Sequence, residues 1–261
     1  MPTTRREARR ALSRKLLDAY ERSRAYRRPA PWSREVIIKL DEATFPAAFA
    51  PDGREELVAL RDAAEELASL GAARLARAQG WTDGEPRELR LGAGEVGRAY
   101  EVASEDGYEP LEVGLGAVSA HAARLRGGPL WMDAFLEGVE RRVVAGDLAP
   151  LGMSVERFKR DWRELISAMT AAARLAGGIA GWERVVSETL FGDSKRLAEV
   201  RARVVDLLVR ADPRWDGWTA EDGEDVLELY GVRRKPGLIV CAGQAELALS
   251  GRSYALDDFV P

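Results

Sequence analysis

The sequence predicts an α+β protein that is mainly helical. Apolar residues recur at three- and four-residue spacing through much of the 261 residues, which indicates amphipathic helices. Short β-branched or alternating runs near residues 36–38, 73–91 and 238–256 indicate a few strands. Charge is unevenly distributed, because residues 1–40 hold twelve basic and four acidic residues whereas residues 211–261 are acidic. This polarity favours an N-terminal end that meets a polyanion, although a solvated helix face gives the same pattern.

The first predicted module covers residues 1–108. In chain order we expect a helix over 8–26 ended by Pro29 and Pro31, a strand over 36–38, a helix from Asp52 or Gly53 to a cap at Gly71, and strands over 73–78 and 87–91. Helix, strand, helix and ribbon is the order of a winged helix, in which a helix enters a DNA groove and the ribbon tip contacts the backbone. The sequence therefore predicts a winged-helix-like N-terminal module.

The second predicted module, residues 109–261, is a helical and winged-helix-like unit that ends in a small antiparallel sheet. We expect helices over 130–144, 155–176 (capped by Ser154), 182–190, 195–210 and from Thr219 to Gly231, and strands over 238–241, 245–249 and 253–256. Apolar residues of the 155–176 helix alternate steps of three and four, which is a heptad seam. Such a seam packs within the chain or against a partner helix, so a homodimer stays open.

Composition excludes several classes of protein. No apolar run approaches the roughly 18 residues that a membrane span needs, so we expect no membrane partner and a cytoplasmic location. Cys241 is the single cysteine and His121 the single histidine, so neither an internal disulfide nor a zinc cage can form. We expect no catalytic residue, no metal ligand and no cofactor in this chain.

Basic residues at the start and on the ribbon are the first candidate DNA contacts. The helix over 54–70 is acidic and suits a DNA groove poorly, so we place the contacts on the first helix and the ribbon. The residues are Arg5, Arg6, Arg9, Arg10, Arg14 and Lys15 on the helix, and Arg74 and Arg87 on the ribbon. Winged helices also serve as pure protein contacts, and that alternative remains open.

The segment from Phe191 to Leu197 is a second candidate. Asp193 or Ser194 can cap the following helix, and Lys195 and Arg196 then lie in a first turn whose dipole disfavours cations. An anionic partner, or phosphate bound by the free N–H groups, would relieve that cost. A plain capping turn is the alternative. Arg233, Arg234 and Lys235 form a further basic loop that contacts DNA or balances nearby acids.

Residues 92–97 match the GxGxxG pattern of dinucleotide-binding loops. That fingerprint requires a buried parallel strand before the loop and another after the helix. The preceding run over 88–91 is too polar, and the run over 111–113 is too short. We expect these glycines to end the ribbon, with a nucleotide-binding enzyme as the alternative.

Four segments resemble the JetD subunit of the Wadjet plasmid-defence system. They are SETLFGDSKRL (187–197), YGVRRKPGL (230–238), LLDAYERS (16–23) and WSREVIIKL (32–40). That family resembles the A subunit of topoisomerase VI, with an N-terminal arm, a winged helix and a Toprim nuclease domain that binds magnesium, and SMC-type subunits deliver its DNA. The resemblance therefore implies duplex DNA and the SMC-type Wadjet subunits as partners.

Two departures from the topoisomerase pattern shape this expectation. No tyrosine follows Lys195 and Arg196 within four residues, so transesterification is not expected. The sequence stops at residues 257–261, about where the Toprim domain would begin. We therefore expect the DNA-binding and docking portion of a JetD-like nuclease subunit that is not catalytic on its own, with magnesium only in the absent domain. A pure assembly module without DNA contact is the alternative.

Overall fold

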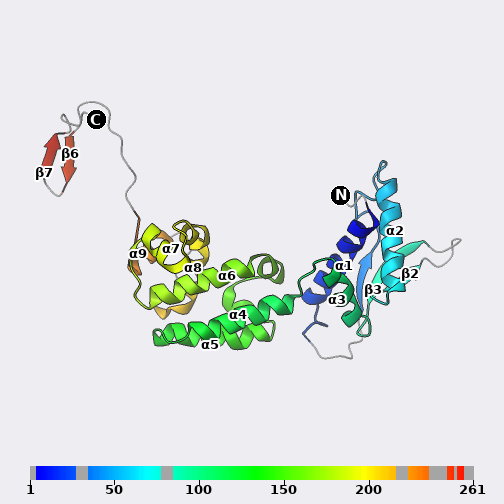
Figure 1. Ribbon diagram of the computed structural model, residues 1–261, viewed down its shortest axis with the longest axis horizontal. Helices are drawn as coiled ribbons and strands as arrows, with labels where there is room; N and C mark the ends of the chain where they lie inside the picture. The colour runs from blue at the N-terminus through cyan, green and yellow to red at the C-terminus, as the bar shows by residue number, and fades with distance from the viewer. Residues whose placement is uncertain are drawn as a thin grey trace.

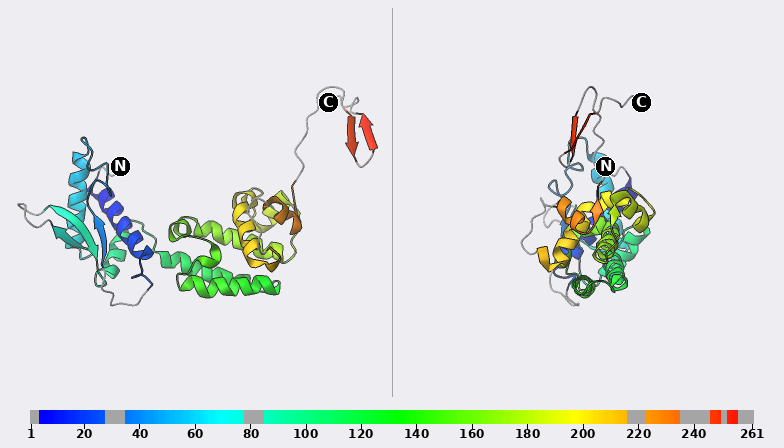
Figure 2. Two further views of the ribbon diagram at one scale, coloured as in Figure 1. Left: turned by 180° about the vertical axis from the view of Figure 1, so that it is seen from behind. Right: turned by 90° about the vertical axis from the view of Figure 1, so that its left-hand side faces the viewer.

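The protein has two separate hydrophobic cores. The computed structural model describes residues 4–27, 35–77, 85–215, 223–234, 246–249 and 252–255. One core gathers buried residues between Ala8 and Tyr108, and the other gathers those between Leu111 and Val232. Figures 1 and 2 show the corresponding bodies side by side. We call them the N-terminal module and the helical module.

Helix α1 (Arg5–Arg22) opens the N-terminal module. It begins earlier than predicted, because Thr4 and Glu7 form a capping box ahead of the apolar stripe. It ends at Ser23, whose N–H donates to the carbonyl of Tyr20. The predicted range of 8–26 was therefore displaced at both ends. Pro29 and Pro31, which we expected to end the helix, lie outside the described residues and beyond its observed end.

A three-stranded antiparallel sheet completes this module, with α3 (Val96–Glu105) packed on α1. Its strands are β1 (Val36–Lys39), β2 (Arg74–Arg77) and β3 (Pro86–Leu91), in the order β1-β3-β2. Helix α2 (Arg54–Ser69) packs on α1 and on the ribbon, and Gly71 turns the chain into β2 with a φ of 70°. Strand β3 is the central strand, and its Leu89 and Leu91 are fully buried where α1 and α2 pack on it.

The helical module is a bundle of helices with one very short sheet (Figure 1). In chain order it contains α4 (Leu111–Leu125), α5 (Leu130–Val144), the 3₁₀ turn η1 (Ala149–Leu151), α6 (Val155–Ala176), β4 (Gly181–Trp182), α7 (Glu183–Phe191), α8 (Arg196–Ala211), η2 (Pro213–Trp215), α9 (Gly223–Leu229) and β5 (Val232–Arg233). Helix α6 has the predicted bounds, and Ser154 caps it by accepting the N–H of Arg157. Its seam packs on α4 and α8 of the same chain.

The remaining strands are short. Strands β4 and β5 pair in parallel. Each has two residues, which is too short a run to predict a strand from the sequence. Strands β6 (Glu246–Leu249) and β7 (Arg252–Ala255) form an antiparallel hairpin within a residue of the predicted positions. The strand expected over 238–241, Cys241 and Thr219 lie outside the described residues. None of the helices in the described ranges is both long and apolar enough to cross a membrane.

Candidate nucleic-acid interface

Arg10 and Arg14 form an exposed basic pair on α1. They lie one helical turn apart and so on the same side of the helix. Within the described ranges, neither guanidinium has a carboxylate partner. Two adjacent cations without counter-charges suit phosphate contact, because no intramolecular ion pair must be broken first.

The other arginines of the predicted basic start hold α1 in place. Arg9 lies between Asp106 and Glu66 at 2.9 and 2.8 Å, with only 16% of its side chain exposed. Its hydrogen bonds lower the pKa of Asp106 against the opposing effect of burial. Arg5 contacts Glu66 at 2.7 Å and Arg6 contacts Asp106 at 3.4 Å. The structure thus gives these three residues intramolecular partners.

Lys15 is also engaged within the N-terminal module. Its Nζ donates to the carbonyl of Thr44 at 2.9 Å and lies 4.7 Å from the centre of the Phe45 ring. The side chain is therefore half-buried against the turns that follow β1. Among the six basic residues predicted on the first helix, Arg10 and Arg14 are the two that remain unpaired in the described part of the chain.

The ribbon shows the same division between paired and unpaired cations. Arg74 forms an ion pair with Glu35 and a second with Glu95 at 3.3 Å. Arg87 on β3 is exposed and has no carboxylate partner in the part of the chain that the structure describes. It is therefore the ribbon residue best suited to meet a phosphate.

The turn between α7 and α8 is held by a serine from the preceding helix. The hydroxyl of Ser187 is buried, donates to the carbonyl of Asp193 at 2.5 Å and accepts the N–H of Leu197 at 2.9 Å. The N-cap of α8 is Lys195, not Asp193 or Ser194 as predicted, and no side chain caps it. Asp193 instead accepts the N–H of Lys195 at 2.8 Å. The predicted cap was therefore wrong in its position.

The cations near this turn differ in their surroundings. Lys195 is exposed without a carboxylate partner among the described residues, whereas Arg196 forms an ion pair with Glu199 at 2.7 Å. Arg233 on β5 is exposed, and Arg234 lies 3.4 Å from Glu183. Lys235 lies outside the described residues.

The glycine-rich loop follows an antiparallel strand. β3 pairs antiparallel with both β1 and β2, so the loop over 92–97 is not part of a parallel strand–helix–strand unit. The N–H of Gly92 already donates to the carboxylate of Glu95 at 2.8 Å. A dinucleotide loop would leave that donor free for the pyrophosphate.

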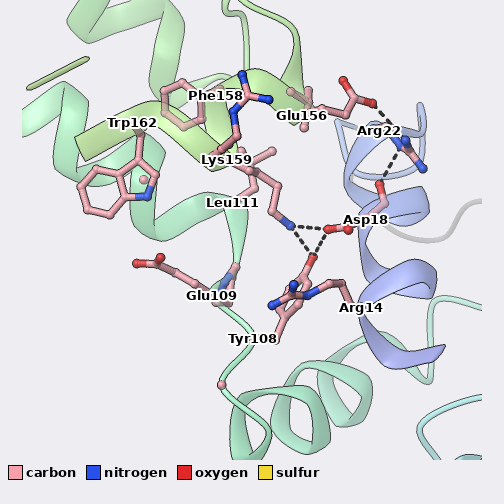
Figure 3. A pocket seen from close by; sticks show the side chains of 15 residues that line it. Arg14, Asp18, Arg22, Tyr108, Glu109, Leu111, Glu156, Phe158, Lys159 and Trp162 are labelled. Carbon is pink, nitrogen blue, oxygen red and sulfur yellow. Dashed lines mark hydrogen bonds and ion pairs between the residues drawn. The ribbon is translucent and has the colours of Figure 1, made fainter. Parts of the chain in front are cut away.

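A cavity of about 430 Å³ lies between the two modules. Figure 3 shows Arg14 pointing into it from α1, opposite Lys159 and Trp162 of α6. Tyr108 and Glu109, on the segment that joins α3 to α4, line its floor. Arg14, an unpaired cation of the predicted interface in the described structure, therefore lines the same cavity as Tyr108 and Lys159, which the sequence did not mark as functional.

A buried carboxylate lies behind Tyr108 and Lys159, two residues that line this cavity. Glu21 is 0% exposed, accepts the N–H of Leu111 at 2.8 Å and lies 2.6 Å from Nζ of Lys159. The hydroxyls of Tyr100 and Tyr108 lie 3.0 and 2.9 Å from its oxygens. Burial, followed by the charge of Glu21, raises the pKa of both tyrosines. Both phenols therefore stay neutral donors.

Lys159 joins three acceptors on the opposite side of the junction. Its Nζ lies 2.5 Å from Asp18, 2.6 Å from Glu21 and 2.6 Å from the hydroxyl of Tyr108. One signal could have pointed to this cluster: Glu21 continues the buried stripe of α1 four residues after Leu17. A carboxylate at an apolar position requires a partner, but the sequence does not say which one.

Comparisons with protein-family models, with curated proteins and with solved structures find no match for this chain.

Proposed function

We propose that this chain is the DNA-binding and docking portion of a JetD-like subunit of a Wadjet-type anti-plasmid defence nuclease, and that it does not cut DNA on its own. Arg10 and Arg14 carry the DNA-binding part of the proposal, because they are exposed, adjacent and without counter-charges in the described structure. Arg87, Lys195 and Arg233 supply further contacts to phosphate. The Wadjet assignment rests on the sequence resemblance.

The topology of the N-terminal module supports the DNA-binding part. Its order of helix, strand, helix and ribbon, with strands arranged β1-β3-β2, is compatible with a winged helix. In our proposal, α1 and β3 face the duplex and α2, with its acidic first turn at Glu55 and Glu56, faces away from it. Contacts to phosphate alone predict strong salt dependence and little sequence preference.

Salt-dependent binding to a duplex tests this proposal. We expect the intact chain to bind a 30-base-pair duplex of arbitrary sequence at low salt, with an affinity that falls linearly on a log–log plot against salt. The variant Arg10→Ala/Arg14→Ala should bind more weakly, and its slope should be less steep by about 2, since each phosphate contact contributes about 0.9.

The matched control is Arg141→Ala/Arg174→Ala, which removes two exposed arginines from the helical module. We expect this control to leave the slope unchanged. If the intact chain does not bind at low salt, the assembly module without DNA contact replaces our proposal. Equal losses in both double variants would mean that α1 has no special part in binding.

A plasmid assay tests the non-catalytic part of the proposal. Supercoiled plasmid incubated with the chain and magnesium or manganese should stay supercoiled. Nicking that disappears on chelation of the metal and persists in the variant His121→Ala would contradict it. His121 serves as control because its ring bonds Thr170 within the helical module, away from the proposed interface.

A further inference from the structure

The junction between the two modules has the construction of a hinge. The chain passes from Tyr108, the last buried residue of the N-terminal core, to Leu111, the first of the helical core, through Glu109 and Pro110. Just before this segment, Gly107 ends α3 with a φ of 78°, and the N–H of Tyr108 donates to the carbonyl of Ala103. A short segment of this kind can change its backbone angles while both modules stay intact.

The contacts across the junction are mainly polar. Arg22 of α1 contacts Glu156 at the start of α6 at 3.0 Å, and Lys159 contacts Asp18 and Glu21. The side chain of Tyr26, just after α1, packs against the core of the helical module. Between these contacts lies the 430 Å³ cavity, where a fixed interface would have packed side chains.

Glu21 and Lys159 have different roles in this junction. Glu21 of α1 accepts the N–H of Leu111, the first residue of α4 and of the helical core, so this bond also crosses the junction, next to the connecting segment. Lys159 lies about one turn into α6 and reaches across the cavity to α1 (Figure 3). The contacts of Lys159 come from another helix and can break when the modules rotate, whereas the bond of Glu21 to Leu111 lies next to the connecting segment, where rotation displaces the atoms least.

We propose that Lys159 is a latch that fixes the angle between the N-terminal and helical modules. When its contacts to Asp18 and Glu21 are present, the modules hold one orientation. When they are lost, the modules rotate about Glu109 and Pro110, the residues between the two cores. The coupling of this latch to DNA rests on the proposed function: a phosphate that reaches Arg14 enters the same cavity and competes with Asp18 for Lys159.

Distance measurements between two labels test the latch without DNA. In a Cys241→Ser background, Ser69→Cys on α2 and Ala134→Cys on α5 place one label on an exposed site of each module. We expect a single narrow distance distribution with Lys159 present. Lys159→Met, which keeps the length of the side chain and removes its charge, should at least double the width of that distribution.

The control is Arg174→Met, which removes an exposed cation from the last turn of the same helix, one without a carboxylate partner among the described residues. It should leave the distribution narrow. If Lys159→Met does not fold, Lys159→Gln replaces it, because it also removes the charge that pairs with Asp18 and Glu21 but keeps a polar end group. An unchanged distribution in a folded Lys159→Met or Lys159→Gln variant would overturn the latch.

Adding duplex DNA tests the coupling separately. DNA should broaden the distance distribution of the chain that retains Lys159 and Asp18. Asp18→Asn, which removes the carboxylate that competes with phosphate for Lys159, should bind DNA several-fold more tightly, since coupling between two equilibria is reciprocal. Binding without any change in distance would overturn the coupling and leave the latch intact. A chain that does not bind DNA would overturn the proposed function, while the experiment without DNA would still decide the latch.

Discussion

Glu21 shows how much depends on one buried charge. It is fully buried, and its partners come from α6, from the start of α4 and from two tyrosines. Replacing Glu21 by Ala leaves Lys159 with one carboxylate partner, Asp18. It leaves the N–H of Leu111 without its carboxylate acceptor. We expect the free energy of unfolding to fall by about 3–5 kcal/mol, the cost of removing one partner of a buried ion pair.

Urea unfolding measures this loss. The control is Glu105→Ala, an exposed carboxylate at the end of α3 without a partner among the described residues. It should change the free energy of unfolding by no more than about 0.5 kcal/mol. A loss below about 1 kcal/mol for Glu21→Ala would mean that water replaces its partners.

The carboxylate of Asp212 makes the free energy of unfolding depend on pH in the acid range. Burial alone would raise its pKa, but hydrogen bonds from Arg214 and Tyr230 outweigh burial and lower the pKa to about 2. Since the folded pKa lies below the unfolded value of about 3.9, this stabilisation is present above pH 4 and is lost as the pH falls towards 2. Asp212→Asn should remove that part of the acid dependence.

Unfolding by urea at several pH values checks this prediction. The difference in free energy of unfolding between the unsubstituted chain and Asp212→Asn should be constant from pH 7 to 5 and shrink between about pH 4 and 2. Glu105→Gln is the control, because its exposed carboxylate lacks a partner in the described structure. A difference that stays constant down to pH 2 would contradict the prediction.

At the scale of the element, the turn between α7 and α8 depends on Ser187. Its buried hydroxyl satisfies the N–H of Leu197 at the start of α8. Ser187→Ala leaves that donor buried without a partner, so we expect a loss of about 1–3 kcal/mol and faster amide exchange over residues 192–197. Thr189→Ala is the matched control, since its hydroxyl bonds a carbonyl of its own helix on an exposed face.

The outcome of that comparison bears on the basic turn. If the amides of residues 192–197 exchange equally fast in Ser187→Ala and Thr189→Ala, the Ser187 hydroxyl does not hold the turn. If only Ser187→Ala exchanges faster, the position of Lys195 is set by a residue eight positions earlier in the chain. The sequence placed the turn correctly, because Gly192 and the break in apolar spacing mark it. It expected Asp193 or Ser194 to cap α8, whereas the N-cap is Lys195 and its side chain makes no capping bond.

The sequence predicted those helices and strands whose caps or apolar spacing are visible within the element itself. Helix α6 has a Ser154 cap and an apolar seam along its whole length, so its bounds were correct. For α1 the apolar stripe starts after the helix does, and the capping box of Thr4 and Glu7 marks the true start. The β4–β5 pair has no local signal, and for the Lys159–Glu21 contact the sequence marks Glu21 on the apolar stripe of α1 but not its partner. That contact joins residues 138 positions apart, which only the folded chain brings together.

At the scale of the whole molecule, the two cores share few apolar contacts. The buried residues of the N-terminal module end at Tyr108 and those of the helical module begin at Leu111. Each module therefore has a core of its own, and the polar junction links them. We expect the fragments 1–110 and 111–261 to give separate cooperative thermal transitions, monitored by circular dichroism.

The fragments also separate the two origins of the Glu21 effect. In the fragment 1–110, Lys159 and the N–H of Leu111 are absent, and water reaches the face of α1 that the helical module covers. Glu21→Ala should then cost less than in the intact chain, because only the hydrogen bonds from Tyr100 and Tyr108 remain to be lost. The difference from the cost in the intact chain measures the coupling between modules. If Glu21→Ala costs the same in both settings, Glu21 stabilises the N-terminal module alone, and the junction does not depend on it.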